Sequence, residues 1–170
     1  MYQSIALLKV LISIEPNQFG FLGNLLFSAL IVLFVTGIFA FVGFAYPTYK
    51  LLPKNYYLIK KPAHIRWWYK FLGVKYFKVF LLIMFWGKPQ NRKKYFNGTK
   101  QGLRNFVFQT KQSEFGHLLA FIMVLIFSLI LLFHKHHQLV LLVTILNLIA
   151  NFYPIILQRF HRIRIDTLVH

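Results

Sequence analysis

The sequence predicts an all-α integral membrane protein with three transmembrane helices: a first span, then a C-terminal helical hairpin, with a basic segment between them. Three observations point to this class. Apolar residues make up 58% of the chain, its mean hydropathy is +0.57, and 20 Lys and Arg stand against 3 Asp and Glu. Such values rarely coincide in a soluble core, but they do where the charges are confined to loops. At 170 residues the chain is long enough for one membrane domain, residues 1–170.

The first span is expected over residues 22–46. Between Glu15 and Lys50, 34 consecutive residues carry no formal charge, and about 20 apolar residues suffice to cross the hydrocarbon. The preceding stretch SIALLKVLISI near the N-terminus is expected to lie on the outer face of the membrane.

Two further apolar intervals predict the other spans, over about residues 117–134 and 138–158. The first of them contains LLAFIMVLIFSLILLF, Leu118 to Phe133. Only HKHH and its flanks join the two intervals. We therefore expect an antiparallel hairpin.

The segment of residues 47–113 is strongly basic. It holds 15 of the 20 Lys and Arg, and the C-terminal tail adds three more. Loops of this kind stay in the cytoplasm under the positive-inside rule. With three spans, the N-terminus and the turn at residues 134–137 then lie outside a cell membrane, and the basic segment and the C-terminus lie inside.

Within the basic segment, WWYKFLGVKYFKVFLLIMFW, Trp67 to Trp86, mixes aromatic residues with lysines before it becomes apolar. Basic and aromatic residues together favour an amphipathic helix at the lipid interface. Its apolar end, Val79 to Trp86, is too short to span a membrane and is expected to dip into it as a re-entrant element.

Glu114 and His117 precede the apolar core of the second span and are three residues apart, so they project from nearly the same helical face. A carboxylate and an imidazole held this way can work as an orienting acid and a general base. Alternatively, Glu114 interacts with the helix dipole and His117 is an interfacial residue. The two residues alone favour this second interpretation.

Polar groups also mark the third span. Asn147, Asn151 and Gln158 fall within one stripe of a helix, at a depth that lets them face Glu114 and His117 across the hairpin. Pro154 leaves the Ala150 carbonyl without its usual helical partner. Polar groups at membrane depth usually face a protein interior or a wet cavity.

Three arginines crowd the end of this span. They act either as a positive-inside anchor or as a binding site for a phosphate or carboxylate headgroup, and the residues alone leave both open. They are Arg159, Arg162 and Arg164.

Two stretches, QTKQSEFGHL (Gln109–Leu118) and NFYPIILQRFHRIRI (Asn151–Ile165), resemble motifs of the glycosyl-4,4'-diaponeurosporenoate acyltransferase family of carotenoid glycolipid (staphyloxanthin-type) biosynthesis. A third, WYKFLGVKYFK (Trp68–Lys78), is similar to an aromatic–lysine stretch of that family, although Phe77 replaces an expected tryptophan. His161 replaces the usual asparagine of the second motif. The matching motif residues are Thr110, Lys111, Glu114, His117, Asn151, Pro154, Gln158, Arg159, Phe160, Arg162 and Arg164.

The resemblance implies an enzyme that esterifies a sugar hydroxyl of a glycosylated carotenoid, or a similar membrane glycolipid, with a fatty acyl group. The donor would be an acyl-CoA or an acyl carrier protein. His117 would take the proton of the attacking hydroxyl while Glu114 fixes the imidazole tautomer. Asn151 and Gln158 would donate to the developing oxyanion. A phosphate or carboxylate of donor or glycolipid would be held by Arg159, Arg162 and Arg164.

The alternative is a non-enzymatic membrane subunit or scaffold, in which Glu114, Asn151 and Gln158 are hydrogen-bonding groups between helices. A membrane-protein partner or a second copy of the chain is compatible with both. No cofactor is expected. With no cysteine, disulfides and thiolate catalysis are excluded. The histidines of the 134–137 turn have no nearby carboxylate, so no metal site is expected. The aromatics of the basic segment favour anionic lipid over nucleic acid.

Overall fold

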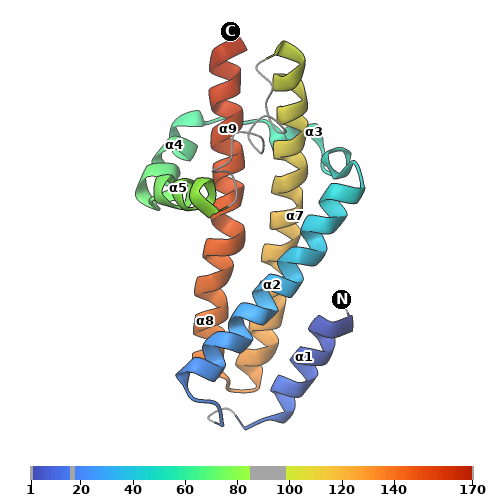
Figure 1. The fold of residues 1–170 in the computed structure, drawn as a ribbon, viewed down its shortest axis with the longest axis vertical. Helices are drawn as coiled ribbons and strands as arrows, with labels where there is room; N and C mark the ends of the chain where they lie inside the picture. Colours follow the sequence, from blue (N-terminus) through green and yellow to red (C-terminus); the bar gives the residue numbers. More distant parts are fainter. Residues whose placement is uncertain (1, 16–17, 85–98, 170) are drawn as a thin grey trace. The chain divides into compact units, whose positions relative to one another are not determined.

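The computed structural model describes residues 2–15, 18–84 and 99–169 (Figure 1). Within these ranges it contains helices and no strand, and three stretches are long and apolar enough to cross a membrane: Phe21–Gly43, Gln101–Phe133 and His137–Thr167. The predicted class, an all-α membrane protein, is confirmed. The chain forms two compact units. Unit 1 comprises Met1–Ala45 and Gly116–Phe152, and unit 2 comprises Tyr46–Phe115 and Tyr153–His170.

Unit 1 is a helical bundle around an apolar core. Its core includes Ile31, Val35, Val124, Leu131 and Val143, each at most 2% exposed. A short turn joins the last two long helices, with Lys135 at φ 62° and a hydrogen bond from the His136 N–H to the Leu131 carbonyl. The elements are α1 (Tyr2–Ser13), α2 (Phe21–Ala45), residues 116–133 of α7 (Lys100–Phe133), α8 (His137–Asn147) and the π-helical turn η2 (Leu148–Phe152).

Small and polar side chains join the helices of unit 1. A Cβ added at Gly116 would lie 2.9 Å from the carbonyl oxygen of Phe39, so α2 and α7 approach closely there. Asn24 of α2 donates a 2.8 Å hydrogen bond to Gln138 of α8. Between helices in lipid, close backbone approach and buried hydrogen bonds replace the hydrophobic effect as the source of attraction.

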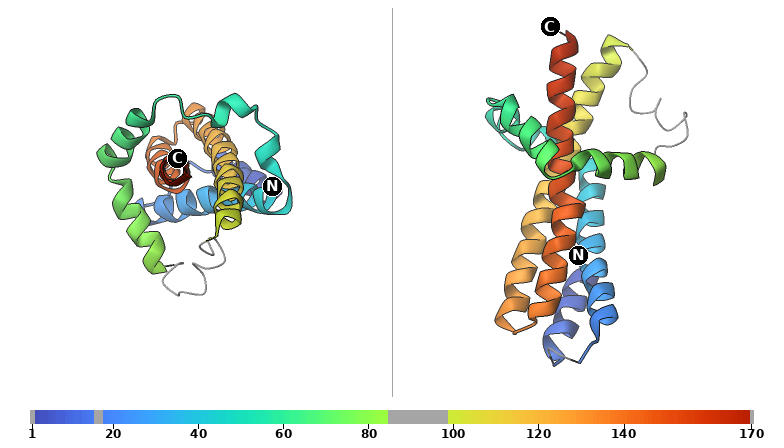
Figure 2. Two further views of the ribbon diagram at one scale, coloured as in Figure 1. Left: turned by 90° about the horizontal axis from the view of Figure 1, so that it is seen from above. Right: turned by 90° about the vertical axis from the view of Figure 1, so that its left-hand side faces the viewer.

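Unit 2 holds the basic segment and the end of the chain. Helices α4 and α5 both pack on α9, and Figure 2 shows them following one another past it. The Tyr69 and Phe160 rings stack at 3.9 Å, and Phe77 meets Tyr153 edge-on at 5.8 Å. The elements are η1 (Thr48–Lys50), α3 (Lys54–Tyr57), α4 (Pro62–Phe71), α5 (Val74–Met84), residues 100–115 of α7, and α9 (Tyr153–Val169).

The described part of the stretch Trp67–Trp86 forms the end of α4 and then α5, where a single helix was expected. Gly73 lies at φ 62°, a left-handed conformation that ends a helix readily only at glycine. The N–H groups of Leu72 and Gly73 bond back to the carbonyls of Trp68 and Lys70, closing the last turn of α4. The end of the expected re-entrant element, residues 85–86, lies outside the described residues.

The second and third long helices extend beyond the apolar intervals that predicted them. Helix α7 begins at Lys100, before the span expected over residues 117–134, and α9 continues to Val169, past the span expected over residues 138–158. Hydropathy marks only the part of a helix that suits hydrocarbon, whereas the helix continues until a breaker or a cap ends it.

Candidate functional site

In unit 1, four polar side chains from different segments form what we call the His117 cluster: Thr36 of α2, His117 of α7, Asn147 of α8 and Asn151 of η2. The Oδ1 atom of Asn151 lies 3.1 Å from His117 Nδ1 and accepts a 3.1 Å hydrogen bond from the Thr36 hydroxyl. Asn151 Nδ2 donates to Asn147 Oδ1 at 2.8 Å, and Asn147 Nδ2 donates to the Phe121 carbonyl at 3.1 Å. Both asparagines are fully buried.

These contacts determine the tautomer of a neutral His117. A backbone carbonyl can only accept, so the Asn147 atom facing Phe121 must be its NH2 group. Its oxygen then faces Asn151, whose NH2 group must point to it and whose oxygen must face the imidazole. The proton therefore sits on Nδ1 of His117, and the lone pair is on Nε2. A general base needs that lone pair.

The backbone beside the cluster is irregular. Residues Leu148–Phe152 form a π-helical turn, and such turns occur frequently at functional sites. Pro154 has no N–H to offer the Ala150 carbonyl.

In unit 2, Glu114 joins two arginines of α9, and together with Tyr56 and Tyr57 they form what we call the Glu114 cluster. Arg159 Nε lies 2.7 Å from Glu114 Oε1, and Arg162 NH2 pairs with Oε2. The Glu114 side chain is fully buried and Arg162 is 4% exposed. The Tyr56 and Tyr57 rings lie 5.0 and 5.7 Å from the guanidinium carbons of Arg159 and Arg162.

The Glu114 cluster keeps an excess positive charge, because one carboxylate faces two guanidinium groups. Arg162 Nε and NH1 are buried and have no hydrogen-bond partner among the described residues. Burial, and after it the negative charge of Glu114, raises the pKa of Tyr57 to about 12. The Tyr57 hydroxyl therefore stays protonated and can only donate or accept a hydrogen bond at physiological pH.

The remaining expected site residues have other partners. Gln158 donates from Nε2 to the Ser113 hydroxyl at 3.1 Å. Arg164 is exposed and lines a pocket of unit 2 together with Arg66 and Lys70. Within the part of the chain that the structure describes, no group of three or more His, Cys, Asp or Glu could hold a metal ion.

One expected contact differs in the structure. The partner of His117 Nδ1 is Asn151, not Glu114, whose two oxygens are taken by arginines. Asn151 presents its oxygen to His117 and gives one N–H to Asn147, so one N–H is left for the expected oxyanion contact, which stays a prediction. Spacing along a helix predicted which residues share a face but not which partner each would select.

Sequence reasoning missed three participants: Thr36, Tyr56 and Tyr57. A threonine in an apolar span and two tyrosines in a basic segment carry no motif, so no local signal distinguishes them. Asn147 was visible as a polar residue in a span, but its link to the Phe121 carbonyl depends on the packing of α7 against α8.

The family model for glycosyl-4,4'-diaponeurosporenoate acyltransferase matches residues 53–170. The chain belongs to this family. No curated protein and no solved structure matches it. The matched region contains the whole Glu114 cluster and three of the four members of the His117 cluster, leaving out only Thr36. The family resemblance expected from the motifs at residues 109–118 and 151–165 is thereby confirmed, and it supports acyl transfer to a glycosylated carotenoid.

Proposed function

We propose that this acyltransferase family member esterifies a sugar hydroxyl of a glycosylated carotenoid or similar membrane glycolipid, with His117 as the general base. The observation that carries the proposal is the hydrogen-bond chain ending on Asn151, because it holds the His117 proton on Nδ1 and leaves the Nε2 lone pair for a substrate hydroxyl. General-base assistance of this kind contributes about 10²–10⁴-fold in rate.

The donor is a fatty acyl thioester, acyl-CoA or acyl carrier protein. The sugar oxygen forms a bond to the acyl carbon as its proton moves to His117 Nε2. When the tetrahedral intermediate collapses, the carbon–sulfur bond breaks, and the imidazolium returns the proton to the leaving thiolate. Asn151 Oδ1 accepts from Nδ1–H throughout, so it orients the ring and favours the imidazolium, as an asparagine does in Cys-His-Asn hydrolases.

Unit 2 supplies positive charge for an anionic part of a substrate. The Glu114 cluster keeps one net positive charge after the carboxylate is counted, and Arg164 has no carboxylate partner among the described residues. Arginine suits phosphate and carboxylate because of its planar fork of donors. Gln158 gives one Nε2–H to Ser113 and has a second N–H on the same nitrogen. We propose that this second N–H donates to the oxyanion.

We infer from the charge pattern that the reaction takes place at the cytoplasmic side of the cell membrane. Residues 47–113 carry 15 of the 20 Lys and Arg, and α9 carries three more. Under the positive-inside rule both lie in the cytoplasm, with the N-terminus outside. Cytoplasmic acyl donors would reach that side directly.

The test compares His117→Ala, Asn151→Leu and His134→Ala, the last an exposed histidine of the turn as the matched control. Acylated glycolipid and membrane-protein abundance are measured in the same cells. We expect loss of product by about a hundredfold or more for His117→Ala and a large loss for Asn151→Leu, both at normal abundance. The control should keep wild-type product.

Two outcomes oppose the proposal. Normal product from the His117→Ala protein removes the general base. If product and abundance instead fall together in both variants, the polar groups hold helices together and the chain acts as a scaffold, as the contacts Asn24–Gln138 and Asn147–Phe121 would permit.

A further inference from the structure

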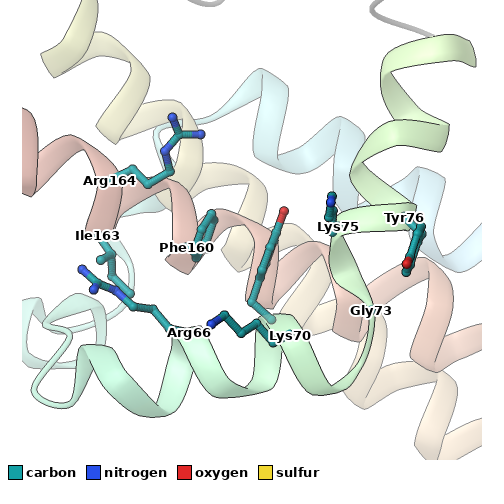
Figure 3. A pocket seen from close by; sticks show the side chains of 9 residues that line it. Arg66, Lys70, Gly73, Lys75, Tyr76, Phe160, Ile163 and Arg164 are labelled. Carbon is teal, nitrogen blue, oxygen red and sulfur yellow. The ribbon is translucent and has the colours of Figure 1, made fainter.

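Unit 2 contains a pocket of about 580 Å³ between α4, α5 and α9. Figure 3 shows the side chains that line it, which come from all three helices: Arg66 and Lys70 from α4, Lys75 from α5, and Arg164 from α9. The left-handed turn at Gly73 separates α4 from α5, and so both helices contribute lysines to one pocket. None of the Glu114 cluster residues lines it.

The pocket carries four cations and no acidic residue. The two ion pairs among the described residues are those of Glu114 with Arg159 and Arg162. The four cations of the pocket therefore have no carboxylate partner among the described residues. Lys78 lies near Arg164, and its pKa is lowered by burial first and by that arginine second. Neighbouring like charges repel one another, and a bound anion would relieve this repulsion.

The walls of the pocket are aromatic and apolar. Phe160 stacks on Tyr69 with ring centroids 3.9 Å apart, and Ile163 is 5% exposed. Trp67 and Phe71 of α4, in contrast, are 53% and 66% exposed and stack on each other. Aromatic rings and basic side chains on one helix suit the boundary between headgroups and acyl chains. A ligand there meets cations and an apolar surface together.

We propose that this pocket binds the phosphate groups of an amphiphilic anion. Arginine and lysine bind phosphate through charge-assisted hydrogen bonds, and the aromatic wall accommodates an apolar part of the same molecule. Two sources have this chemistry: the phosphates of a coenzyme A thioester, and the headgroup of an anionic phospholipid. If the ligand is a coenzyme A thioester, the pocket is the donor subsite, and that assignment rests on the proposed function. The existence of a phosphate site in this pocket does not depend on the proposed function.

The experiment uses the full chain in phosphatidylcholine nanodiscs and measures binding of coenzyme A and, separately, retention of phosphatidylglycerol. The pocket variant Arg66→Gln/Lys70→Gln is compared with Lys54→Gln/Lys60→Gln, which removes the same two charges from exposed positions that do not line the pocket. All four side chains are exposed, so neither variant disturbs a core. Circular dichroism checks that helicity is equal.

Losing two charge-assisted contacts should weaken phosphate binding by about tenfold or more in the pocket variant. The control should stay within about twofold, because its two lysines do not line the pocket. A selective loss of coenzyme A binding supports the site and assigns it to the donor. A selective loss of phosphatidylglycerol supports the site and assigns it to lipid. Equal changes in both variants for both probes overturn the proposal.

The binding measurement is independent of the chemistry at His117. The His117→Ala protein should bind the same probe as the wild type, because its substitution lies in unit 1. If that protein still makes product, the proposed base is wrong while the phosphate site stands. If binding fails in the pocket variant and the control alike, the phosphate site is wrong and the base is unaffected.

Discussion

Glu114 and Arg159 form an ion pair, with Arg159 Nε 2.7 Å from Glu114 Oε1, although the two residues are 45 positions apart in the chain. Arg162 holds the other carboxylate oxygen. Since the carboxylate is fully buried, its charge is compensated chiefly by these two guanidinium groups.

Glu114→Gln should therefore destabilise the protein strongly. Removing one partner of a buried ion pair costs about 3–5 kcal/mol, because the remaining charge is left uncompensated. Thermal unfolding in detergent, followed by circular dichroism, measures the effect. Glu15→Gln, at an exposed acid, is the control. An unchanged melting temperature for Glu114→Gln would contradict the pairing, and adding Arg162→Met should recover part of the loss if it is correct.

Gly116→Ala should loosen the packing of α2 on α7. The added methyl group would lie 2.9 Å from the Phe39 carbonyl oxygen, and overpacking of this kind costs about 1–3 kcal/mol. Gly37→Ala is the matched control, because a Cβ there meets nothing within 4 Å. Alanine is favoured over glycine in a helix by about 1 kcal/mol, so the control should melt at the same or a higher temperature. Equal effects of the two substitutions would argue against close approach at Gly116.

Tyr57→Phe should flatten the loss of stability at high pH. The pKa of Tyr57 rises from its ordinary value of 10.0 to about 12 in the folded protein. Between these values only the unfolded chain releases the proton, so stability is present below pH 10 and falls as pH rises toward 12. The slope from this group is at most about 1.4 kcal/mol per pH unit.

Denaturation at pH 8 and at pH 11 separates wild type from the Tyr57→Phe variant. At pH 8 the two should be similar or the variant slightly more stable, because the Tyr57 hydroxyl is buried without a partner among the described residues. At pH 11 the variant should be clearly the more stable. If the difference in stability between the wild type and the Tyr57→Phe variant is the same at both pH values, Tyr57 does not keep its proton in the folded state.

The orientation in the membrane can be tested without removing any native thiol, since the chain has no cysteine. Single cysteines at the exposed positions Gln101, Lys135 and Thr167 are treated with a membrane-impermeant maleimide. We expect Lys135→Cys to label in intact cells, and the other two only after the membrane is opened. Labelling of Lys135→Cys from the same side as Gln101→Cys would refute the predicted topology.

Asn147 should act as a positioning residue for His117, through Asn151. The contact of Asn147 with the Phe121 carbonyl sets which way the Asn151 amide points. If Asn147 is replaced, the Asn151 amide can turn over, and the His117 proton can then occupy either ring nitrogen. Asn147→Leu should lower kcat by about tenfold with little change in KM. Nitrogen-15 spectra of the imidazole should show the Nδ1–H form in wild type and a mixture in the variant. An unchanged spectrum with lowered kcat would assign Asn147 a structural role only.

The membrane class and the three spans were predictable from sequence because hydropathy is a local property: a run of about 20 apolar residues suits hydrocarbon whatever the rest of the chain does. Helix ends were less predictable. The helix that carries Glu114 starts at Lys100, since nothing in residues 100–116 breaks it. The break at Gly73 depends on a left-handed residue that glycine permits but does not require.

The sequence by itself determined most of the polar residues that meet in the two clusters of this acyltransferase family member, because Glu114, His117, Asn151 and the arginines of α9 stand out against their apolar surroundings. Only the tertiary structure decided their partners. A spacing of three or four residues places side chains on one face of a helix, but hydrogen bonds form where a donor and an acceptor from different helices meet within about 3 Å. That meeting depends on how the helices pack: Glu114 bonds to arginines of α9, and His117 bonds to Asn151 of η2.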